Sequence, residues 1–407
     1  MAQKGKKFNP KIFIKNGTPD YPLIVITFVL LLIGLIMLLS ASTPSSLAET
    51  GDSYSIFRKQ FCFAIGGAFI ATIISFLNFE FLVKSKFIQK LLYVGSFLLT
   101  LSVLVLGVSS GGANRWIEIP GFGSFQPSEL VKIAMLLFYG GYLPTLKERI
   151  KNTNGFIKKY WVGFALPIVL IVILLVTILM VQNHLSVCIL ITCIVGAQMF
   201  VSGMIEKRFF IATMILVLIA ALLAGGVFGI YTLVNSNKVA VEETEESGFN
   251  FRSERIKVWL DPDSNLTGTG WQINQSFYAI GSGGLFGVGL GNSNQKNLYI
   301  PEPHNDFIFA VVAEEIGFVG CMFIILLFVM FIWRGLIIAM NAIDMEGTLL
   351  AIGTTALIGM ESIINMAVVT GTIPVTGMPL PFFSYGGTSM IVNLIAVGIL
   401  ISVSRKK

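Results

Sequence analysis

Charged side chains are scarce in this chain of 407 residues. Asp, Glu, Lys and Arg together make up 12% of it, about half of the roughly 25% that is usual in soluble domains, whereas apolar residues make up 55%. This composition excludes an ordinary soluble protein and indicates that lipid is the main solvent. We therefore expect one membrane domain over residues 1–407 and do not divide the chain by length.

Cysteine is also rare, and no internal repeat of the kind found in many transporters is visible. The four cysteines lie in apolar runs and lack the paired spacing of a zinc site or a disulfide framework. They are Cys62, Cys188, Cys193 and Cys321. We interpret them as packing residues.

Long apolar runs dominate the chain instead. Nine of them are suited to cross the roughly 30 Å hydrocarbon core as helices. They are 22–41, 60–78, 91–108, 161–181, 185–203, 208–229, 305–332, 347–370 and 386–403. A shorter run, 128–143, carries Glu129 and Lys132, and the charges on its two sides alternate correctly only if it crosses as well. The sequence thus predicts an all-α polytopic membrane protein with about ten transmembrane helices.

The positive charges predict the orientation. Residues 1–20 form a basic tail, and the run that follows is too long for a cleaved secretory signal, so we interpret it as a retained helix. Lysine and arginine then gather in the loops on the same side as this tail, which places both termini in the cytoplasm. Topology thereby explains the net charge of +6, and no nucleic-acid partner is expected.

One outer loop, residues 230–304 between the seventh and eighth predicted spans, is much longer than the others. Long ordered loops are usually functional. Its glycine-rich part, 281–291, matches neither the dinucleotide fingerprint nor the P-loop, so we interpret these glycines as sites of close backbone packing. The last outer loop, 371–387, has three prolines in eight residues and is expected to form a rigid, partly buried turn.

Asp306 lies where the long loop becomes a helix. Asn305 or Asp306 could cap that helix, and a fixed carboxylate there would also suit a proton acceptor. Glu302, His304 and Asp306 alternate along an extended stretch, which permits a divalent cation site, but one histidine and two carboxylates are a weak signature. The metal ligands therefore stay unassigned.

Several other polar residues lie at or below the predicted outer surface. Glu129 and Lys132 are spaced for an intrahelical ion pair, and an anion-binding role remains equally open. Arg115 and Trp116 place a cation beside an aromatic ring, although tryptophan at this depth is also an ordinary membrane anchor. Glu314 and Glu315 indicate either a network behind the site or a polar seam between helices.

Five motifs in this order resemble one family closely, the SEDS (shape, elongation, division, sporulation) proteins FtsW, RodA and SpoVE. They are Gly112-Ala-Asn-Arg-Trp116, Phe125-Gln-Pro-Ser-Glu-Leu-Val-Lys132, Gln275-Ser-Phe-Tyr-Ala-Ile-Gly-Ser-Gly-Gly284, Tyr299-Ile-Pro-Glu-Pro-His-Asn-Asp-Phe-Ile-Phe309 and Pro374-Val-Thr-Gly-Met-Pro-Leu-Pro-Phe-Phe-Ser-Tyr-Gly-Gly387. The wording of the motifs is more similar to the FtsW and SpoVE branch than to RodA.

The resemblance implies a peptidoglycan glycosyltransferase that polymerises lipid II on the outer face of the bacterial cytoplasmic membrane, at the division septum or in sporulation. It also implies a class B penicillin-binding protein and other division or sporulation proteins as partners. Asp306 matches the catalytic aspartate of the family. The substrate-binding candidates on the matching motifs and beside them are Arg115, Trp116, Glu129, Lys132, Gln275, Lys296 and His304.

The chain departs from the family at two positions. Asn305 stands where the family often has threonine, a polar exchange that leaves the neighbouring carboxylate in place. The turn 182–186 lacks the acidic residue of many relatives, which puts a cation role for that turn in doubt, with His184 as a substitute.

Because an α-linked donor yields a β-1,4 glycan, one inverting displacement suffices. Asp306 would accept the proton of the acceptor hydroxyl. Arg115, Lys132 and Lys296 are candidates to stabilise the diphosphate, with a divalent Mg or Mn ion as an optional helper.

Two other classes of function stay open, a lipid II flippase and a scaffold that only recruits partners. A flippase needs no base at the outer rim, so it would tolerate loss of the Asp306 carboxylate. Within the enzyme class, a RodA-type role in elongation is the alternative to division or sporulation.

Overall fold

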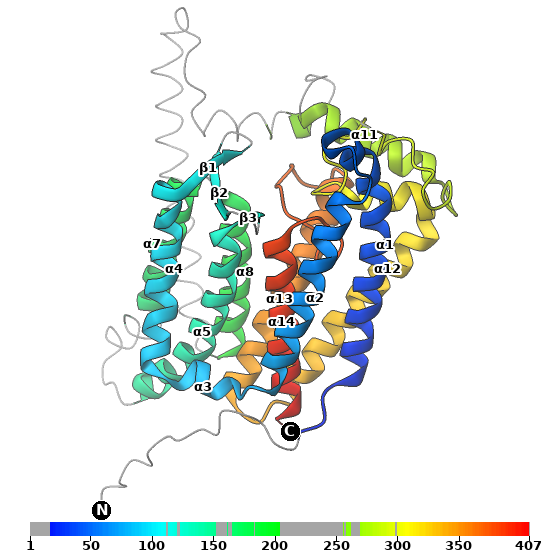
Figure 1. The fold of residues 1–407 in the computed structure, drawn as a ribbon. Helices are drawn as coiled ribbons and strands as arrows, with labels where there is room; N and C mark the ends of the chain where they lie inside the picture. Colours follow the sequence, from blue (N-terminus) through cyan, green and yellow to red (C-terminus); the bar gives the residue numbers. More distant parts are fainter. Residues whose placement is uncertain are drawn as a thin grey trace, which may run out of the picture.

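A computed structural model shows a bundle of helices, most of which run along one common direction (Figure 1). It describes residues 17–110, 113–119, 123–151, 161, 165–182, 184–203, 255, 258–261, 269–297 and 299–406. The helices are α1 (Tyr21–Thr50), α2 (Ser55–Phe76), α3 (Phe79–Lys84), α4 (Lys86–Leu106), α5 (Pro127–Lys151), α7 (Leu166–Gln182), α8 (Leu185–Val201), α11 (Thr269–Gly283), α12 (Ile308–Met340), α13 (Met345–Val369) and α14 (Gly387–Arg405).

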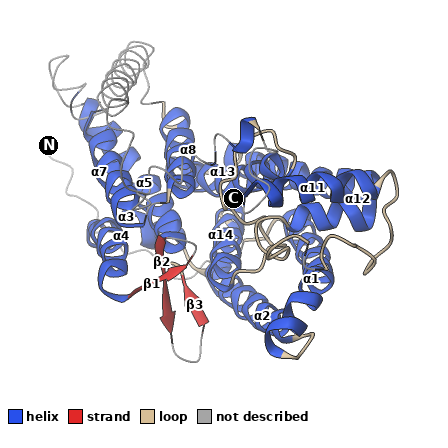
Figure 2. Ribbon diagram, turned by 90° about the horizontal axis from the view of Figure 1, so that it is seen from above, coloured by secondary structure: helices blue, strands red, loops and turns tan. Residues whose placement is uncertain are grey.

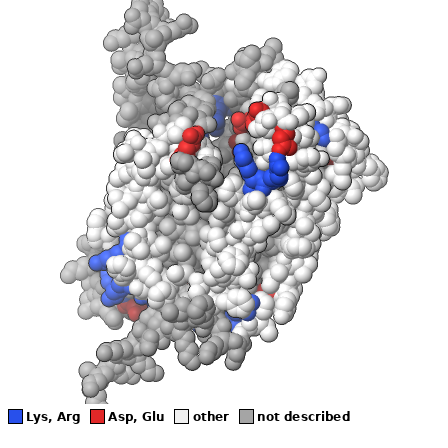
Figure 3. Space-filling view, viewed as in Figure 1, with Lys and Arg blue, Asp and Glu red and all other residues white. Residues whose placement is uncertain are grey.

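Six of the described helices are long and apolar enough to cross a membrane, namely α1, α2, α4, α12, α13 and α14. Helices α7 and α8 are apolar but shorter, and α5 covers the predicted charged span. On the face seen in Figure 3, charged side chains gather towards the two ends of the bundle and the middle is uncharged. This pattern is what a surrounding bilayer requires, because ionised groups facing lipid are costly. The protein is therefore a polytopic membrane protein.

The number of spans stays a prediction. The predicted run 208–229 lies outside the described residues, as does most of the first part of the predicted outer loop 230–304. The described remainder of that loop contains α11, which sequence analysis treated as loop. The assignment of residues 1–407 to one domain also stays a prediction.

The connection between α4 and α5 is a small sheet, which corrects the expectation of an all-α fold. Strands β1 (Gly107–Ser110), β2 (Ala113–Ile119) and β3 (Gly123–Phe125) pair antiparallel in the order β1-β2-β3. Trp116 pairs with Val108 on one side of β2, and Ile117 pairs with Phe125 on the other. Such short strands carry too weak a period to stand out between two long apolar helices.

The first and last described helices meet at one end of the bundle, the lower end in Figure 1. Asp20 N donates to Ser404 Oγ (3.1 Å), and Arg405 Nη1 donates to Gly17 O (3.2 Å). Asp20 also caps α1 by accepting from Leu23 N (3.1 Å). The two ends of the described chain thus lie on one side of the bundle, as an even number of spans requires, and the placement of both termini in the cytoplasm stays a prediction from the charges.

The loop between α13 and α14, residues 370–386, lies at the opposite end and packs into the bundle. Phe382 and Phe383 within it are almost fully buried. The expected buried turn is therefore confirmed, and it brings the last outer loop against the start of α12.

Candidate functional site

Asp306 lies in a short irregular segment immediately before α12, and its side chain is half-buried. The carbonyls of three consecutive residues in this segment accept hydrogen bonds from α13 and the 370–386 loop. They are His304 O from Tyr385 N (2.8 Å), Asn305 O from Ser384 Oγ (2.8 Å) and Asp306 O from Asn365 Nδ2 (2.8 Å). The backbone that carries the carboxylate is therefore held firmly, at the end of the bundle that the charges predict to face outward.

The capping alternative for Asn305 and Asp306 is wrong. The N-cap position of α12 is Phe307, and no side-chain hydrogen bond caps this described helix start. Asn305 instead donates to Glu302 Oε2 (2.7 Å). The Oδ2 atom of Asp306 lies against Gly377, where an added Cβ would stand 3.4 Å from it. Gly377 also has φ +71°, a conformation that favours glycine.

The surroundings of Asp306 make it a stronger base than an ordinary aspartate. Burial raises the pKa of its carboxyl from 3.8 to about 6, Arg255 and Arg115 lower the pKa, and Glu302 raises it. A general base works best with a pKa near the working pH, so this shift suits proton abstraction.

Arg255 is a functional candidate that sequence analysis missed. Its Nη1 donates to Val375 O (3.0 Å) in the 370–386 loop, and four residues later Trp259 Nε1 donates to Gly371 O (2.7 Å). Burial lowers the pKa of Arg255 and the charge of Asp306 raises it. The available signal was an arginine and a tryptophan at helical spacing, which is too common a pattern to be specific.

Arg115 comes to the same region from β2. Its Nε donates to Gln182 O (3.1 Å) at the end of α7, and its charge acts on Asp306. Trp116 follows it in the strand and is half-buried. The structure therefore brings Arg115 and Asp306 into one electrostatic environment from opposite halves of the chain.

Both histidines are buried and favour the neutral form. Burial, together with the charges of Arg115, Lys132 and Arg255, lowers the pKa of His184 to about 3, and its Nδ1 lies 3.3 Å from Gln126 Nε2. Burial also lowers the pKa of His304, whose ring packs edge-on against Tyr385 with centroids 5.7 Å apart.

Glu129 and Lys132 form the predicted ion pair, with Oε2 and Nζ 2.8 Å apart. Lys132 Nζ also donates to Glu361 on α13, a partner that sequence analysis did not name. All three side chains are almost completely buried among α5, α13 and their neighbours. Two carboxylates around one ammonium favour a structural role for Lys132, and its role in substrate binding stays a prediction.

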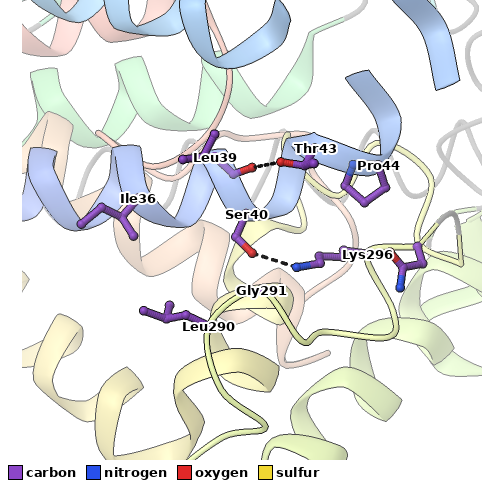
Figure 4. Close-up of a pocket in the computed structure, with 9 residues that line it drawn as sticks. Ile36, Leu39, Ser40, Thr43, Pro44, Leu290, Gly291 and Lys296 are labelled. Carbon is purple, nitrogen blue, oxygen red and sulfur yellow. Dashed lines mark hydrogen bonds between the residues drawn. The ribbon is translucent and has the colours of Figure 1, made fainter. Parts of the chain in front are cut away.

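Lys296 and Gln275 lie on the part of the outer loop that follows residue 268. Gln275 is buried on α11. Lys296 lies in a pocket of about 470 Å³ between α1 and the 290–297 loop, where Nζ donates to Ser40 Oγ (2.9 Å) (Figure 4). The same Nζ also donates to Glu315 Oε1 (2.8 Å). Its positive charge is therefore already paired with a buried carboxylate.

The described residues do not form a cation site at Glu302, His304 and Asp306. Across the described part of the chain, no group of three or more His, Cys, Asp or Glu side chains converges as metal ligands. His304 packs on Tyr385, and the exposed Glu302 accepts from Asn305. These residues do not fit a bound metal, so no chemical step below passes through one, and a requirement for Mg or Mn stays a prediction.

Comparisons with known proteins place this chain in a family. The profile of the FtsW, RodA and SpoVE family, described as cell cycle protein, matches residues 21–407. The chain is 39% identical to stage V sporulation protein E of Bacillus subtilis, over 96% of this chain and 98% of that protein. It is 34% identical to a probable peptidoglycan glycosyltransferase FtsW of Trichlorobacter lovleyi, over 95% and 93% of the two chains.

Solved structures share the fold. A chain of the structure described as "Structural coordination of polymerization and crosslinking by a peptidoglycan synthase complex" superposes with a TM-score of 0.71 at 25% identity, over 95% of this chain and 98% of that one. The rod shape determining protein RodA of Thermus thermophilus gives a TM-score of 0.63 at 24% identity, over 95% and 97% of the two chains.

Proposed function

This chain belongs to the FtsW, RodA and SpoVE family of cell cycle proteins, and from that premise we propose that it is a peptidoglycan glycosyltransferase that polymerises lipid II. Several relatives about 34% identical over most of the chain carry the name of that enzyme. The observation that carries the proposal is Asp306, a half-buried carboxylate at one end of the bundle whose pKa is raised to about 6 and on which the charges of Arg255 and Arg115 act.

The reaction is one displacement with inversion at the donor sugar. The 4-hydroxyl oxygen of the acceptor attacks the anomeric carbon and forms the β-1,4 bond. The bond between that carbon and the diphosphate oxygen breaks, and the diphosphate leaves with the electron pair. Asp306 accepts the hydroxyl proton, a role that typically contributes 10² to 10⁴ in rate. One base suffices because no covalent sugar intermediate needs a second carboxylate.

Arg255 and Arg115 are the cations best placed to stabilise the diphosphate. Both act electrostatically on Asp306, so they belong to the region where the leaving group would gather negative charge. Arginine also suits phosphate oxygens through paired hydrogen bonds. Lys132 and Lys296 are less suited because buried glutamates already pair with them.

The proposed setting is the bacterial cytoplasmic membrane, at the division septum or in sporulation, with a class B penicillin-binding protein that crosslinks the product. The FtsW and SpoVE names of relatives support the setting. The described synthase complex, which joins polymerisation and crosslinking, supports the partner.

The test is polymerisation of purified lipid II by the detergent-solubilised protein, alone and with a candidate class B penicillin-binding protein, with and without Mg or Mn. Wild type should yield glycan polymer, and Asp306→Asn should lose at least about 10² in rate. Glu118→Gln, which removes an exposed carboxylate on β2, is the matched control and should retain activity. Equal activity of Asp306→Asn and wild type would refute the role of the base.

A second candidate, lipid II translocation, is favoured by the buried charges of Glu129, Lys132 and Glu361 among the helices, because such groups often line polar paths. Translocation of labelled lipid II in vesicles separates the two functions. If the protein is a flippase, Asp306→Asn should still transport lipid II. If wild type polymerises lipid II but does not transport it, and Asp306→Asn does not polymerise it, this candidate is excluded.

A further inference from the structure

Helix α12 is broken near its outer end, at Gly317. The residue has φ +67° and ψ −172°, a conformation almost restricted to glycine, although the helix continues on both sides. The break divides α12 into a buried outer segment, 308–316, and a longer segment, 318–340. The outer segment begins two residues after Asp306. Figure 2 shows α11 and α12 side by side in this region.

The hydrogen bonds lost at the break are replaced by a loop. In an unbroken helix, Phe318 N and Val319 N would donate to the carbonyls of Glu314 and Glu315. Here they donate instead to Gly284 O (2.9 Å) and Leu285 O (3.0 Å). The two released carbonyls accept from Val288 N (2.9 Å) and Gly289 N (3.1 Å). The loop therefore completes the helix in both directions.

Two glycines make this close approach possible. A Cβ added to Gly317 would stand 2.2 Å from Gly287 N, and a Cβ added to Gly287 would stand 2.2 Å from Glu315 O. Gly287 also has φ +79°. A side chain at either position would therefore push the loop and the helix apart.

The following part of the loop is held by the Glu314 carboxylate, which is almost fully buried. Its oxygens accept from Ser293 Oγ (2.5 Å), Asn294 N (3.0 Å) and Gln295 N (3.3 Å). The neighbouring Glu315 accepts from Lys296 Nζ and from Ser40 Oγ of α1 (2.6 Å). The two glutamates that sequence analysis left open thus join α12 to the loop and to α1.

We propose that residues 284–295 form a clasp that keeps α12 broken at Gly317 and thereby positions Asp306. The inference about Asp306 rests on the proposed function, whereas the clasp itself rests only on the geometry. Glu314, Gly287 and Gly317 are positioning residues in this view, because they act on Asp306 through the 308–316 segment and do not touch the reacting atoms.

A straight α12 is the alternative state that satisfies the same backbone groups of the helix, and it releases Gly284 O, Leu285 O, Val288 N and Gly289 N of the loop. Leu285, Phe286 and Phe318 around it are apolar and strongly exposed, which indicates that lipid surrounds the break. Open backbone groups are not tolerated in lipid. If the loop withdraws, Phe318 N and Val319 N must therefore return to Glu314 O and Glu315 O, which straightens α12 and moves the segment that leads to Asp306.

Hydrogen–deuterium exchange of the full-length protein in lipid nanodiscs tests the clasp without using activity. Gly287→Ala opens it from the loop side, Gly317→Ala from the helix side, and Glu314→Gln removes the carboxylate that holds residues 293–295. Gly281→Ala is the control, since a Cβ there meets nothing within 4 Å. The two glycine variants should speed exchange at Val288 and Gly289 at least about tenfold, while Phe318 and Val319 stay protected by the re-formed helix.

Either of two results would overturn the clasp. Unchanged exchange at Val288 and Gly289 in both glycine variants would show that the loop does not depend on the glycines. Equally fast exchange at all four amides would show local unfolding without the straight helix. Gly281→Ala should match wild type throughout.

Kinetics of lipid II polymerisation test the link to Asp306. Glu314→Gln and Gly287→Ala should lower kcat about tenfold or more and change KM much less, because misplaced reacting groups slow chemistry more than binding. If exchange shows that the clasp is open in these variants but kcat is unchanged, the clasp does not position Asp306. If wild type forms no polymer in any condition, the proposed function fails, and the exchange experiment still decides the clasp.

Discussion

The side chain of Asn365 joins three parts of the site through one amide group. Its Nδ2 donates to Asp306 O (2.8 Å) and to Met378 O (2.7 Å), so α13, the start of α12 and the 370–386 loop meet at one buried residue. The position of the proposed base thus depends on a helix more than fifty residues further along the chain.

Asn365→Leu should lower both stability and activity. The change leaves the buried Met378 carbonyl without this donor, at a cost of about 1–3 kcal/mol, and the partly buried Asp306 carbonyl without it at a smaller cost. The freed Asp306 backbone should also reduce polymerisation about tenfold or more. Thermal unfolding and lipid II polymerisation measure the two effects. Thr370→Val, which removes an exposed hydroxyl bonded only near the end of the same helix, should be close to wild type in both.

The rate of lipid II polymerisation should decrease as the pH falls through about 6. The pKa of Asp306 is raised to about 6, so the carboxylate is mostly ionised above that pH and mostly protonated below it. Arg255→Gln removes a charge that lowers this pKa. In a plot of kcat/KM against pH, the fall in rate on the acid side should therefore move to higher pH. Glu302→Gln removes a charge that raises this pKa and should move the fall to lower pH. Rate profiles of kcat/KM that shift in the opposite directions would contradict the assignment.

Asp306→Asn should make the protein more stable at neutral pH while it abolishes activity. The folded-state pKa of Asp306 lies above its ordinary value of 3.8, so the folded protein holds a proton that the unfolded chain releases. The stability of wild type should therefore fall as the pH rises from about 4 to about 6 and stay level above.

The amide is neutral throughout this range. Unfolding midpoints of the two proteins should thus agree near pH 4, apart from a constant offset, and diverge above it. If the difference between the two unfolding midpoints is independent of pH, the pKa of the Asp306 carboxyl is not raised in the folded protein.

The buried charges of Glu129, Lys132 and Glu361 should contribute unequally to the stability of the protein. Lys132→Met leaves Glu129 and Glu361 buried without their cation, and breaking such a group typically costs about 3–5 kcal/mol. Glu361→Gln leaves the Glu129–Lys132 pair intact and should cost clearly less. Thermal unfolding in detergent measures this order, and the reverse order would indicate that Glu129 does not compensate Lys132.

Much of the architecture could be predicted because it depends on local features of the chain. The apolar runs within the described residues became helices, the spacing of Glu129 and Lys132 became an ion pair, and the proline-rich stretch near Pro374 became a buried turn. The prediction of Asp306 as the base came from its motif, and the raised pKa and the neighbouring arginines now give it physical support.

Other features needed contacts between distant segments. The sequence around Arg255 is ordinary, and the residue became a candidate only because the fold brings it to Val375 and into the electrostatic environment of Asp306. Glu361 lay within an apolar run without a visible partner until α13 packed beside Lys132. The break in α12 was likewise hidden, because a single glycine in an apolar run is compatible with a continuous membrane helix.

The order of residues alone is enough to predict that this protein lies in a membrane, which side of it collects positive charge, and which family it resembles. Those properties follow from hydropathy, charge and motif wording, which each residue carries independently of the fold. The folded arrangement was needed to see which charges meet, how far the pKa of Asp306 is raised, and where α12 breaks. Coulomb interactions, desolvation and backbone hydrogen bonding depend on distances between segments, and chain order alone does not specify these distances.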